Sequence, residues 1–265
     1  MPTREICSVV FLGAGNLASH LALALVKQNL TVVQVYNRTA WKGKKLAAKT
    51  GAEYISCLDH ITPDADLYIL ALSDSVLPEM VSKIRFRGKL VVHTSGSLDM
   101  HILRPVSSRY GVFYPLQTFS ARTKRSFHHV PVCVESHLVS DQYLLDDLAR
   151  KLTDTVCILN SEKRKWLHMA AVYAGNFSHF MYIIAADLLR DKDIPFDLVK
   201  PLIGQVSKNA RYDRLFPYLT GPAIREDMNI LDQHRALLEH NPDYLEIYNL
   251  ISANIIQYKN QHGKL

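Results

Sequence analysis

The sequence has few cysteines and no long apolar run. Its 265 residues include only 4 cysteines, which lie far apart and form no Cys-x-x-Cys pair, so the usual spacing of a zinc or dithiol motif is excluded. No apolar run approaches the roughly 20 residues of a membrane-spanning helix, and the first residues lack a signal-peptide pattern. We therefore expect a cytoplasmic protein without a membrane segment. Its cysteines are expected to be small core residues in a reducing compartment, namely Cys7, Cys57, Cys133 and Cys157.

Charge of one sign is not concentrated either. The 31 basic and 25 acidic residues give a net charge of +6, with a local basic cluster at residues 122–125. A nucleic-acid-binding face needs a denser basic stripe with interleaved aromatic residues, so no nucleic-acid partner is expected. The 12 histidines include no His-x-x-x-His pair beside a carboxylate, so no metal site is expected. The positive excess instead favours an anionic cofactor and substrate.

A glycine-rich turn near the start of the chain is the most informative motif. The apolar run 6–12 leads into Gly13-Ala14-Gly15-Asn16-Leu17-Ala18, which opens an amphipathic helix over 17–27, and a second strand follows at 31–36. In such a unit, the glycines and the helix N-terminus cradle the pyrophosphate of a dinucleotide. We therefore predict that Gly13, Gly15, Asn16 and Leu17 bind a cofactor. The alternative is a glycine turn that only opens the helix.

The residues after the second strand indicate which dinucleotide binds. NAD-binding proteins of this kind place Asp or Glu there, where it accepts hydrogen bonds from the ribose 2′-hydroxyl. This chain has Asn37, Arg38 and Thr39 instead. An arginine can pair with a 2′-phosphate, and the neighbouring amide and hydroxyl can donate hydrogen bonds to it. The predicted cofactor is therefore NADP(H), and the alternative is a solvated basic loop that opens the next helix.

Polar residues also end several later strands. Apolar runs at 66–72, 89–92 and 110–113 each lead into a polar segment. Ligands of doubly wound sheets lie at the carboxyl ends of the strands, although Ser and Asp at such ends also serve as helix N-caps. The expected cofactor contacts are Leu72, Ser73 and Asp74, and the expected substrate contacts are Thr94, Ser95 and Gln117.

After residue 160 no strand pattern recurs and helical periodicity dominates. The pattern predicts helices over 161–190, with Ser161 as N-cap, and over 197–212, 227–240 and 242–259. The sequence thus predicts an α/β domain over 1–159 and an all-α domain over 160–265. In the first of these helices, four residues recur on one face and Asn176 lies beside them: His168, Val172, Gly175 and His179.

These features resemble known families. The glycine turn, the Asn37-Arg38-Thr39 segment and the helical second half resemble the pyrroline-5-carboxylate reductase and β-hydroxyacid dehydrogenase superfamily. A closer resemblance, to a bacterial group of Rossmann-like proteins with a C-terminal domain of the DUF2520 type, covers almost the whole chain. It is carried by His93-Thr94-Ser95-Gly96-Ser97, Pro115-Leu116-Gln117-Thr118-Phe119, Asn176-Phe177 and Thr220-Gly221-Pro222-x-x-Arg225-x-Asp227. The resemblance implies a Rossmann-like, doubly wound and mostly parallel sheet, an all-helical second domain, and a homodimer formed through the helices.

One departure from the better-known relatives bears on the chemistry. Hydroxyacid dehydrogenases of this superfamily carry a proton-donating lysine four residues before an asparagine, and here Val172 stands four residues before Asn176. The difference favours an imine substrate, which needs less acid catalysis once protonated, or another donor. His168 or His179 is the expected replacement, because histidine titrates near neutral pH. Each of these histidines alternatively has a purely structural role.

Together these features predict an NADP-dependent oxidoreductase. Hydride would pass between nicotinamide and a small, anionic imine or carbonyl metabolite, with His168, Asn176 and His179 as the catalytic candidates. Thr94, Ser95, Gln117 and Asn176 are expected to contact the substrate, and Arg225 is a candidate clamp for its carboxylate. The alternative is a non-catalytic NADP(H)-binding sensor or assembly protein, because a fold alone does not give a function.

Overall fold

The computed structural model describes residues 5–121 and 126–262. The chain divides into two compact units, Met1–Asn176 and Phe177–Leu265. The basic cluster at 122–125 lies outside the described residues. No described helix combines the length and apolarity that crossing a bilayer requires.

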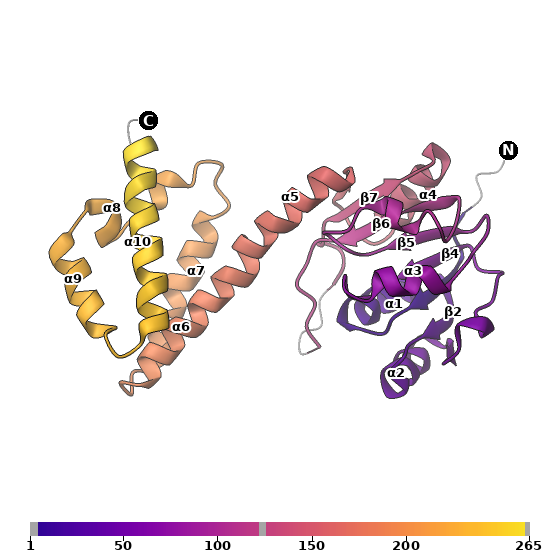
Figure 1. The fold of residues 1–265 in the computed structure, drawn as a ribbon, viewed down its shortest axis with the longest axis horizontal. Coiled ribbons are helices and arrows are strands. Elements are labelled where there is room, and N and C mark those ends of the chain that lie inside the picture. The colour runs from indigo at the N-terminus through magenta and orange to yellow at the C-terminus, as the bar shows by residue number, and fades with distance from the viewer. Residues whose placement is uncertain (1–4, 122–125, 263–265) are drawn as a thin grey trace. The chain divides into compact units, whose positions relative to one another are not determined.

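The first unit is built on one eight-stranded sheet with the order β3-β2-β1-β4-β5-β6-β7-β8 (Figure 1). All neighbouring strands are parallel except β6 and β7, which are antiparallel. The predicted doubly wound, mostly parallel sheet is therefore confirmed. The strands are β1 (Ser8–Leu12), β2 (Thr31–Tyr36), β3 (Glu53–Ile55), β4 (Leu67–Leu70), β5 (Leu90–His93), β6 (Arg109–Pro115), β7 (Val132–Ser136) and β8 (Val156–Ile158).

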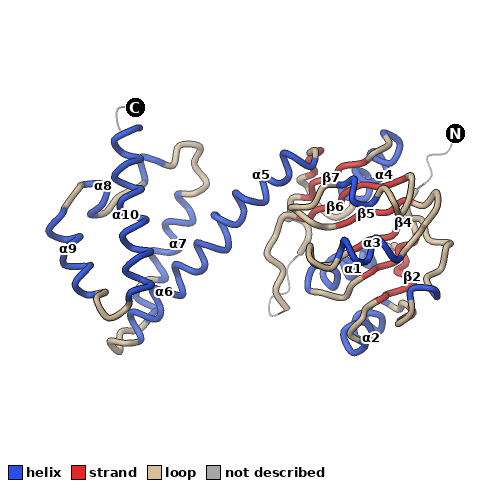
Figure 2. The backbone as a smooth tube through the Cα atoms, in the orientation of Figure 1, coloured by secondary structure: helices blue, strands red, loops and turns tan. Residues whose placement is uncertain are grey.

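Helices cover both faces of this sheet (Figure 2). Alternate residues of β1 point to opposite faces: Phe11 packs with α1 (Asn16–Lys27), α2 (Ala40–Thr50) and α4 (Val139–Arg150), whereas Leu12 packs with α3 (Leu77–Lys83). Burial on both faces explains the continuous apolar runs of the parallel strands.

The strand order changes direction at β1. From β1 the chain proceeds to β2 on one side, and β4 then pairs with the other side of β1. Loops leaving β1 and β4 therefore separate at the carboxyl edge of the sheet, which opens a crevice there. The glycine turn lies at this point.

A buried ion pair attaches α5 (Ser161–Ala171) to the sheet. Arg164 is 0% exposed and pairs through Nη1 with Glu135 of β7. Its Nη2 donates to the Leu98 carbonyl, in the loop after β5, and to Ser161 Oγ at 3.1 Å. The same carboxylate accepts the Ser161 amide at 2.8 Å and the Ser161 hydroxyl at 2.7 Å. These bonds fix where α5 begins and which side it turns to the sheet.

Ser161 is not the N-cap of α5, so that prediction is wrong. The cap is Asn160, whose side chain accepts a hydrogen bond from the Lys163 amide at 2.9 Å. The Ser161 side chain points inward to Glu135, so it is not available to cap the helix. Another expectation also needs correction: Cys7 and Cys57 are exposed, and only Cys133 is fully buried. Cys7 directly precedes β1.

The long helix predicted over 161–190 is not a continuous α-helix. A π-helical segment, Val172–Phe177, separates α5 from α6 (Ser178–Arg190). The π-helix closes its hydrogen bonds over five residues instead of four, so the α-helical spacing that placed His168 and His179 on one face does not hold through it. Such segments are frequent at functional sites, and this one contains Asn176.

The described part of the second unit contains helices and the turns between them, and no strand. Its longest helix, α10, contacts the others through side-chain bonds: Tyr244 donates to Asp187 of α6 at 2.8 Å, and Tyr248 meets His234 of α9 at 2.8 Å. Besides α6, the α-helices are α7 (Lys200–Asn209), α8 (Pro222–Arg225), α9 (Met228–Leu237) and α10 (Pro242–His262). The predicted helical second half is thereby confirmed.

Replacing Arg164 with alanine is expected to destabilise the protein by about 3–5 kcal/mol, because the Glu135 carboxylate would stay buried without its partner. Urea denaturation followed by circular dichroism measures the loss. The matched control is Arg150→Ala, which removes an exposed ion pair with Asp146 and should change stability little. Equal losses in the two variants would contradict the role given to Arg164.

Candidate functional site

Gly13 forms the turn that ends β1. Its φ of +114° lies where L side chains are strained. An added Cβ would lie 2.2 Å from the Ala71 carbonyl oxygen, just after β4. The turn and the end of β4 are therefore too close together for a side chain at residue 13. The Gly13 amide donates to the Tyr36 carbonyl at 2.8 Å, which joins the turn to β2.

Gly15 lies at the start of α1 in open space. An added Cβ there would meet nothing within 4 Å, and no side chain caps the first amides of α1. The N-terminus of this helix therefore offers unpaired N–H groups and the positive end of the helix dipole. Asn16 donates its side-chain amide to the Phe119 carbonyl at 3.2 Å, while Leu17 packs partly buried against the core.

In the segment after β2, one side chain supports the glycine turn and another is exposed. Asn37 accepts the Ala14 amide at 3.0 Å and donates to the Thr39 carbonyl at 2.8 Å, so its side chain holds the glycine turn in place. Thr39 is the N-cap residue of α2 but makes no side-chain capping bond. Arg38 is exposed and has no ion-pair partner among the described residues. Its guanidinium is thus an exposed positive charge beside the turn.

The loop after β4 keeps its polar side chains in solvent. Ser73 and Asp74 are exposed and Leu72 is half-buried, and the two hydroxyls of Ser73 and Ser75 lie 3.2 Å apart. The Ser73 carbonyl accepts the Val76 and Leu77 amides at 2.9 and 3.0 Å. The loop therefore turns into α3 through backbone bonds, and its side chains remain available.

The loop after β5 is buried and internally bonded. His93 accepts the Ser95 amide at Nδ1 over 3.1 Å, and desolvation by burial lowers the pKa of His93 to about 4, so this histidine is neutral. Ser95 Oγ accepts the Ser97 and Leu98 amides, both at 3.0 Å. Thr94 and Ser95 are buried. The loop is thus rigid, and the Ser95 hydroxyl oxygen already accepts two hydrogen bonds from the loop itself.

A tyrosine and a histidine meet over this loop. Tyr114, near the carboxyl end of β6, places its hydroxyl 3.0 Å from Nδ1 of His168 on α5. Both rings lie against Gly96: an added Cβ there would be 2.7 Å from the imidazole and 2.9 Å from the phenol ring. His168 is half-buried. It is one helical turn after Arg164, which the buried ion pair holds.

The loop after β6 approaches the π-helical segment. Thr118 Oγ1 would lie 3.8 Å from a Cβ added to Gly175, next to the exposed Asn176. Gln117 bends back and accepts the Thr118 amide at 2.9 Å. Both His168 and Asn176 belong to the first unit.

The two remaining predicted residues belong to the second unit. His179 is exposed on α6, with the Tyr182 ring edge-on at 6.3 Å. Arg225 is exposed at the end of α8. The adjacent Glu226 pairs with Lys259 of α10 at 2.8 Å.

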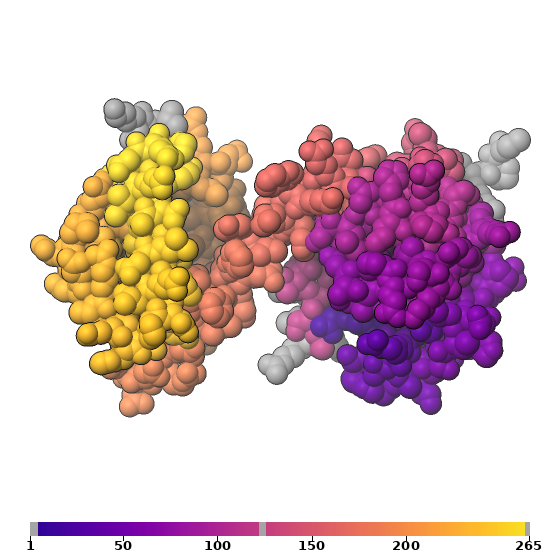
Figure 3. Space-filling model, viewed as in Figure 1, coloured from indigo at the N-terminus to yellow at the C-terminus, as the bar shows by residue number. Residues whose placement is uncertain are grey.

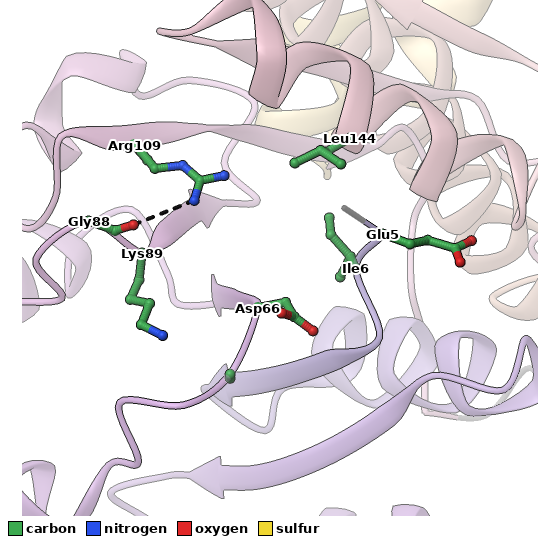
Figure 4. Close-up of a pocket in the computed structure, with 8 residues that line it drawn as sticks. Glu5, Ile6, Asp66, Gly88, Lys89, Arg109 and Leu144 are labelled. Atoms are coloured by element: carbon green, nitrogen blue, oxygen red, sulfur yellow. Dashed lines mark hydrogen bonds between the residues drawn. The ribbon is translucent and has the colours of Figure 1, made fainter. Parts of the chain in front are cut away.

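A hollow lies at the opposite, amino-terminal edge of the sheet (Figure 4). It encloses about 250 Å³ and is lined in part by Asp66, Lys89 and Arg109. Asp66 accepts the Ser8 hydroxyl and amide, and Arg109 pairs with Asp141 at 2.6 Å. The charges of Asp66 and Arg109 are therefore already bonded within the fold.

The described residues contain one group that brings together three potential metal ligands. His128, His129 and Asp154 place ligand atoms within 4.8 Å of one another, and all three are exposed. The two histidines precede β7, and Asp154 precedes β8.

Comparison with known proteins accounts for both halves of the chain. Residues 3–118 match the Rossmann-like domain family, and residues 130–255 match DUF2520, a domain of unknown function. A solved structure from Bacteroides fragilis, named as a candidate NADP oxidoreductase, shares 38% sequence identity and has a TM-score of 0.89, with 96% of this chain and 98% of that chain covered. The chain belongs to this family of Rossmann-like proteins with a DUF2520 domain. No curated protein matches the sequence.

More distant solved structures share the fold of this DUF2520 family member. A reductive aminase from Aspergillus terreus, in complex with NADPH and ethyl levulinate, has 14% identity and a TM-score of 0.72, covering 98% of this chain and 95% of that one. A 1-pyrroline-5-carboxylate reductase from Streptococcus pyogenes has 12% identity and a TM-score of 0.63, covering 94% and 98%. The resemblance to this reductase fold is therefore confirmed.

Sequence reasoning missed Tyr114, Glu135 and Arg164. Tyr114 directly precedes Pro115, the last residue of β6, so its position near the carboxyl edge was a usable signal. Arg164 and Glu135 give no such signal, because a charged residue in a helix or strand is usually exposed. Only the packing of α5 on β7 brings this pair together.

The two glycines of the turn should respond differently to alanine. Gly13→Ala is expected to lower the free energy of unfolding by more than about 1 kcal/mol, because the left-handed conformation penalises a side chain and the Ala71 carbonyl must move. Gly15→Ala should change it by less than about 0.5 kcal/mol, as at an open surface position. Thermal unfolding of the two variants measures both. A loss at Gly15 as large as that at Gly13 would contradict the geometry.

Proposed function

We propose that this protein is an NADP-dependent oxidoreductase that transfers hydride between nicotinamide and a small, anionic imine or carbonyl metabolite. The observation that carries the proposal is Arg38, an exposed arginine without a partner in the described chain, directly beside a glycine turn that Asn37 holds in place. The relatives support it: the fungal reductive aminase binds NADPH, and the 38% identical protein is named for NADP.

The residues present fit this cofactor. The open space at Gly15 and the uncapped start of α1 suit a pyrophosphate, and Arg38 suits a 2′-phosphate because its guanidinium binds phosphate bidentately. Thr39 has a hydroxyl free of capping bonds, while Leu72, Ser73 and Asp74 follow the neighbouring strand. Nicotinamide supplies or accepts the hydride when bound, and the protein supplies position and charge.

Residues near the carboxyl edge of the sheet have proposed roles in binding the substrate and in proton transfer. The half-buried His168 is the proposed proton donor or hydrogen-bond donor, because Tyr114 bonds to Nδ1 and leaves Nε2 for a ligand. Asn176 is proposed to hold a polar group of the substrate. His179 and Arg225, on the second unit, remain proposals for catalysis and carboxylate binding.

A non-catalytic NADP(H)-binding sensor or assembly protein is the second candidate. The observation that favours it is Val172, which stands where hydroxyacid dehydrogenases carry a proton-donating lysine. The two candidates share the cofactor and differ only in turnover.

Steady-state oxidation of NADPH with a panel of cyclic imines and 2-oxo acids separates the two. We expect turnover of at least one substrate class. We also expect Arg38→Ala to weaken NADPH binding about 10- to 100-fold, the effect of losing a charged hydrogen bond worth about 1.5–3 kcal/mol, while NADH binding changes little.

Arg87→Ala is the matched control, because Arg87 is also exposed but lies before β5 at the opposite edge. Tight NADPH binding without turnover of any substrate would favour the sensor. An unchanged preference for NADPH over NADH in Arg38→Ala would contradict the phosphate assignment.

We also propose that the chain forms a homodimer through its helical unit. Only three hydrophobic residues in the described part of that unit are buried: Ala223, Leu231 and Leu238. Large apolar side chains are exposed instead, including Leu202 and Val206, one turn apart on α7, and Leu198 just before this helix. The visible face of the unit also leaves α10 uncovered along its length (Figure 3). A unit with so little core of its own needs a partner surface.

Sedimentation equilibrium is expected to give the mass of a dimer. Leu202→Asp, on this 63% exposed position, should shift the chain to monomer because a charge would be buried in an apolar interface. Val139→Asp, at a similarly exposed position on α4, should leave the dimer intact. A monomeric wild-type chain would contradict the proposal.

A further inference from the structure

The Tyr114 hydroxyl has one hydrogen-bond partner among the described residues. Tyr114 is 8% exposed, and its oxygen lies 3.0 Å from Nδ1 of His168. Desolvation by burial raises the pKa of Tyr114 to about 12, so the phenol keeps its proton at neutral pH. This buried group therefore has an O–H hydrogen that needs an acceptor.

The requirement decides the direction of the bond. If the phenol donates to Nδ1, its hydrogen is satisfied and Nδ1 must be the unprotonated nitrogen of a neutral imidazole. If Nδ1–H donated to the phenol oxygen, the phenol hydrogen would have no acceptor among the described residues, which is unfavourable for a largely buried hydroxyl. The first arrangement places the imidazole hydrogen on Nε2.

The surroundings hold both rings in this arrangement. Gly96 lets them lie directly on the rigid loop after β5, where any larger residue would collide with both. The nearby positive charge of Arg164 is paired with Glu135, and the buried pair fixes the turn of α5 that precedes His168. The edge of His168 that carries Nε2 is the one left for a ligand, because Tyr114 occupies Nδ1.

We propose that Tyr114 is a positioning residue that keeps His168 in the Nε2–H form, and that the substrate is a carbonyl compound whose oxygen accepts this hydrogen bond. The inference rests on the proposed oxidoreductase function and narrows its substrate class. A protonated imine presents an N–H donor, which cannot bond to another donor at Nε2.

The chemistry of a carbonyl suits such a donor. When the carbonyl carbon gains hydride, the C=O π electrons move to the oxygen, which becomes a negatively charged alkoxide. A positioned N–H stabilises that charge as it develops, in the way that neutral histidines polarise carbonyl groups in other enzymes. The alkoxide then takes a proton from water, which balances the reduction to an alcohol.

Nitrogen-15 NMR of the full-length, histidine-labelled protein tests the arrangement without cofactor or substrate. At pH 8 the chemical shifts of the two nitrogens of a neutral imidazole report which one carries hydrogen. His168→Gln identifies the His168 signals by their loss. We expect Nε2–H in the wild type and a mixture of both forms in Tyr114→Phe. Hydrogen on Nδ1 in the wild type would overturn the proposal.

Tyr110→Phe is the matched control. Tyr110 is the second residue of the same strand. Its hydroxyl lies 2.9 Å from Nδ1 of His101, so the substitution removes the same kind of bond away from the site. It should alter the His101 signals and leave those of His168 unchanged. A change at His168 would mean that the Tyr114→Phe result is not local.

Turnover with NADPH then tests the substrate class, using 2-oxobutanoate and related 2-oxo acids against 1-pyrroline-5-carboxylate. We expect reduction of the 2-oxo acids, with kcat about tenfold lower in Tyr114→Phe, KM changed less than twofold, and Tyr110→Phe equal to wild type. Preferred reduction of the imine overturns the carbonyl assignment. Reduction of neither class overturns it together with the proposed function, while failure of the NMR result alone leaves the proposed function standing.

Discussion

The buried pair of Arg164 and Glu135 is the interaction on which the arrangement of the candidate site depends. A fully buried arginine needs an opposite charge and hydrogen-bond acceptors. Here Glu135 of β7 supplies the charge, and the Leu98 carbonyl and Ser161 Oγ accept from Nη2, while Nε has no partner among the described residues. The pair therefore fixes α5 against β7 and against the loop after β5, and this places His168 beside Tyr114.

The carboxyl edge of the sheet combines two kinds of construction. At β1 and β4 the backbone does the work: Gly13 allows the close approach to Ala71, and Gly15 leaves space for a ligand. At β5 and β6 side chains do it, because Tyr114 and His168 sit on the compact loop around Gly96. The first construction is suited to binding a phosphate, and the second to polarising a small substrate.

Family membership and chemistry are separate matters in this protein. The chain belongs to the DUF2520 family and shares its fold with a reductive aminase and a 1-pyrroline-5-carboxylate reductase. Val172, however, stands four residues before Asn176, where hydroxyacid dehydrogenases carry a lysine. A Tyr–His pair supported by a buried ion pair offers a different way to place a donor. The π-helical segment beside it, Val172–Phe177, gives Asn176 a backbone geometry that an α-helix would not provide.

The sequence by itself determined the doubly wound sheet, the glycine turn and the helical second half. These depend on local patterns, namely apolar strands, small residues at a turn and helical periodicity, which neighbouring residues encode directly. Only the tertiary structure decided the direction of β7, the π-helical segment, the capping role of Asn160 and the meeting of Tyr114 with His168. These depend on contacts between residues far apart in the chain, such as the 54 positions that separate Tyr114 from His168, and no local pattern records which buried polar groups will satisfy one another.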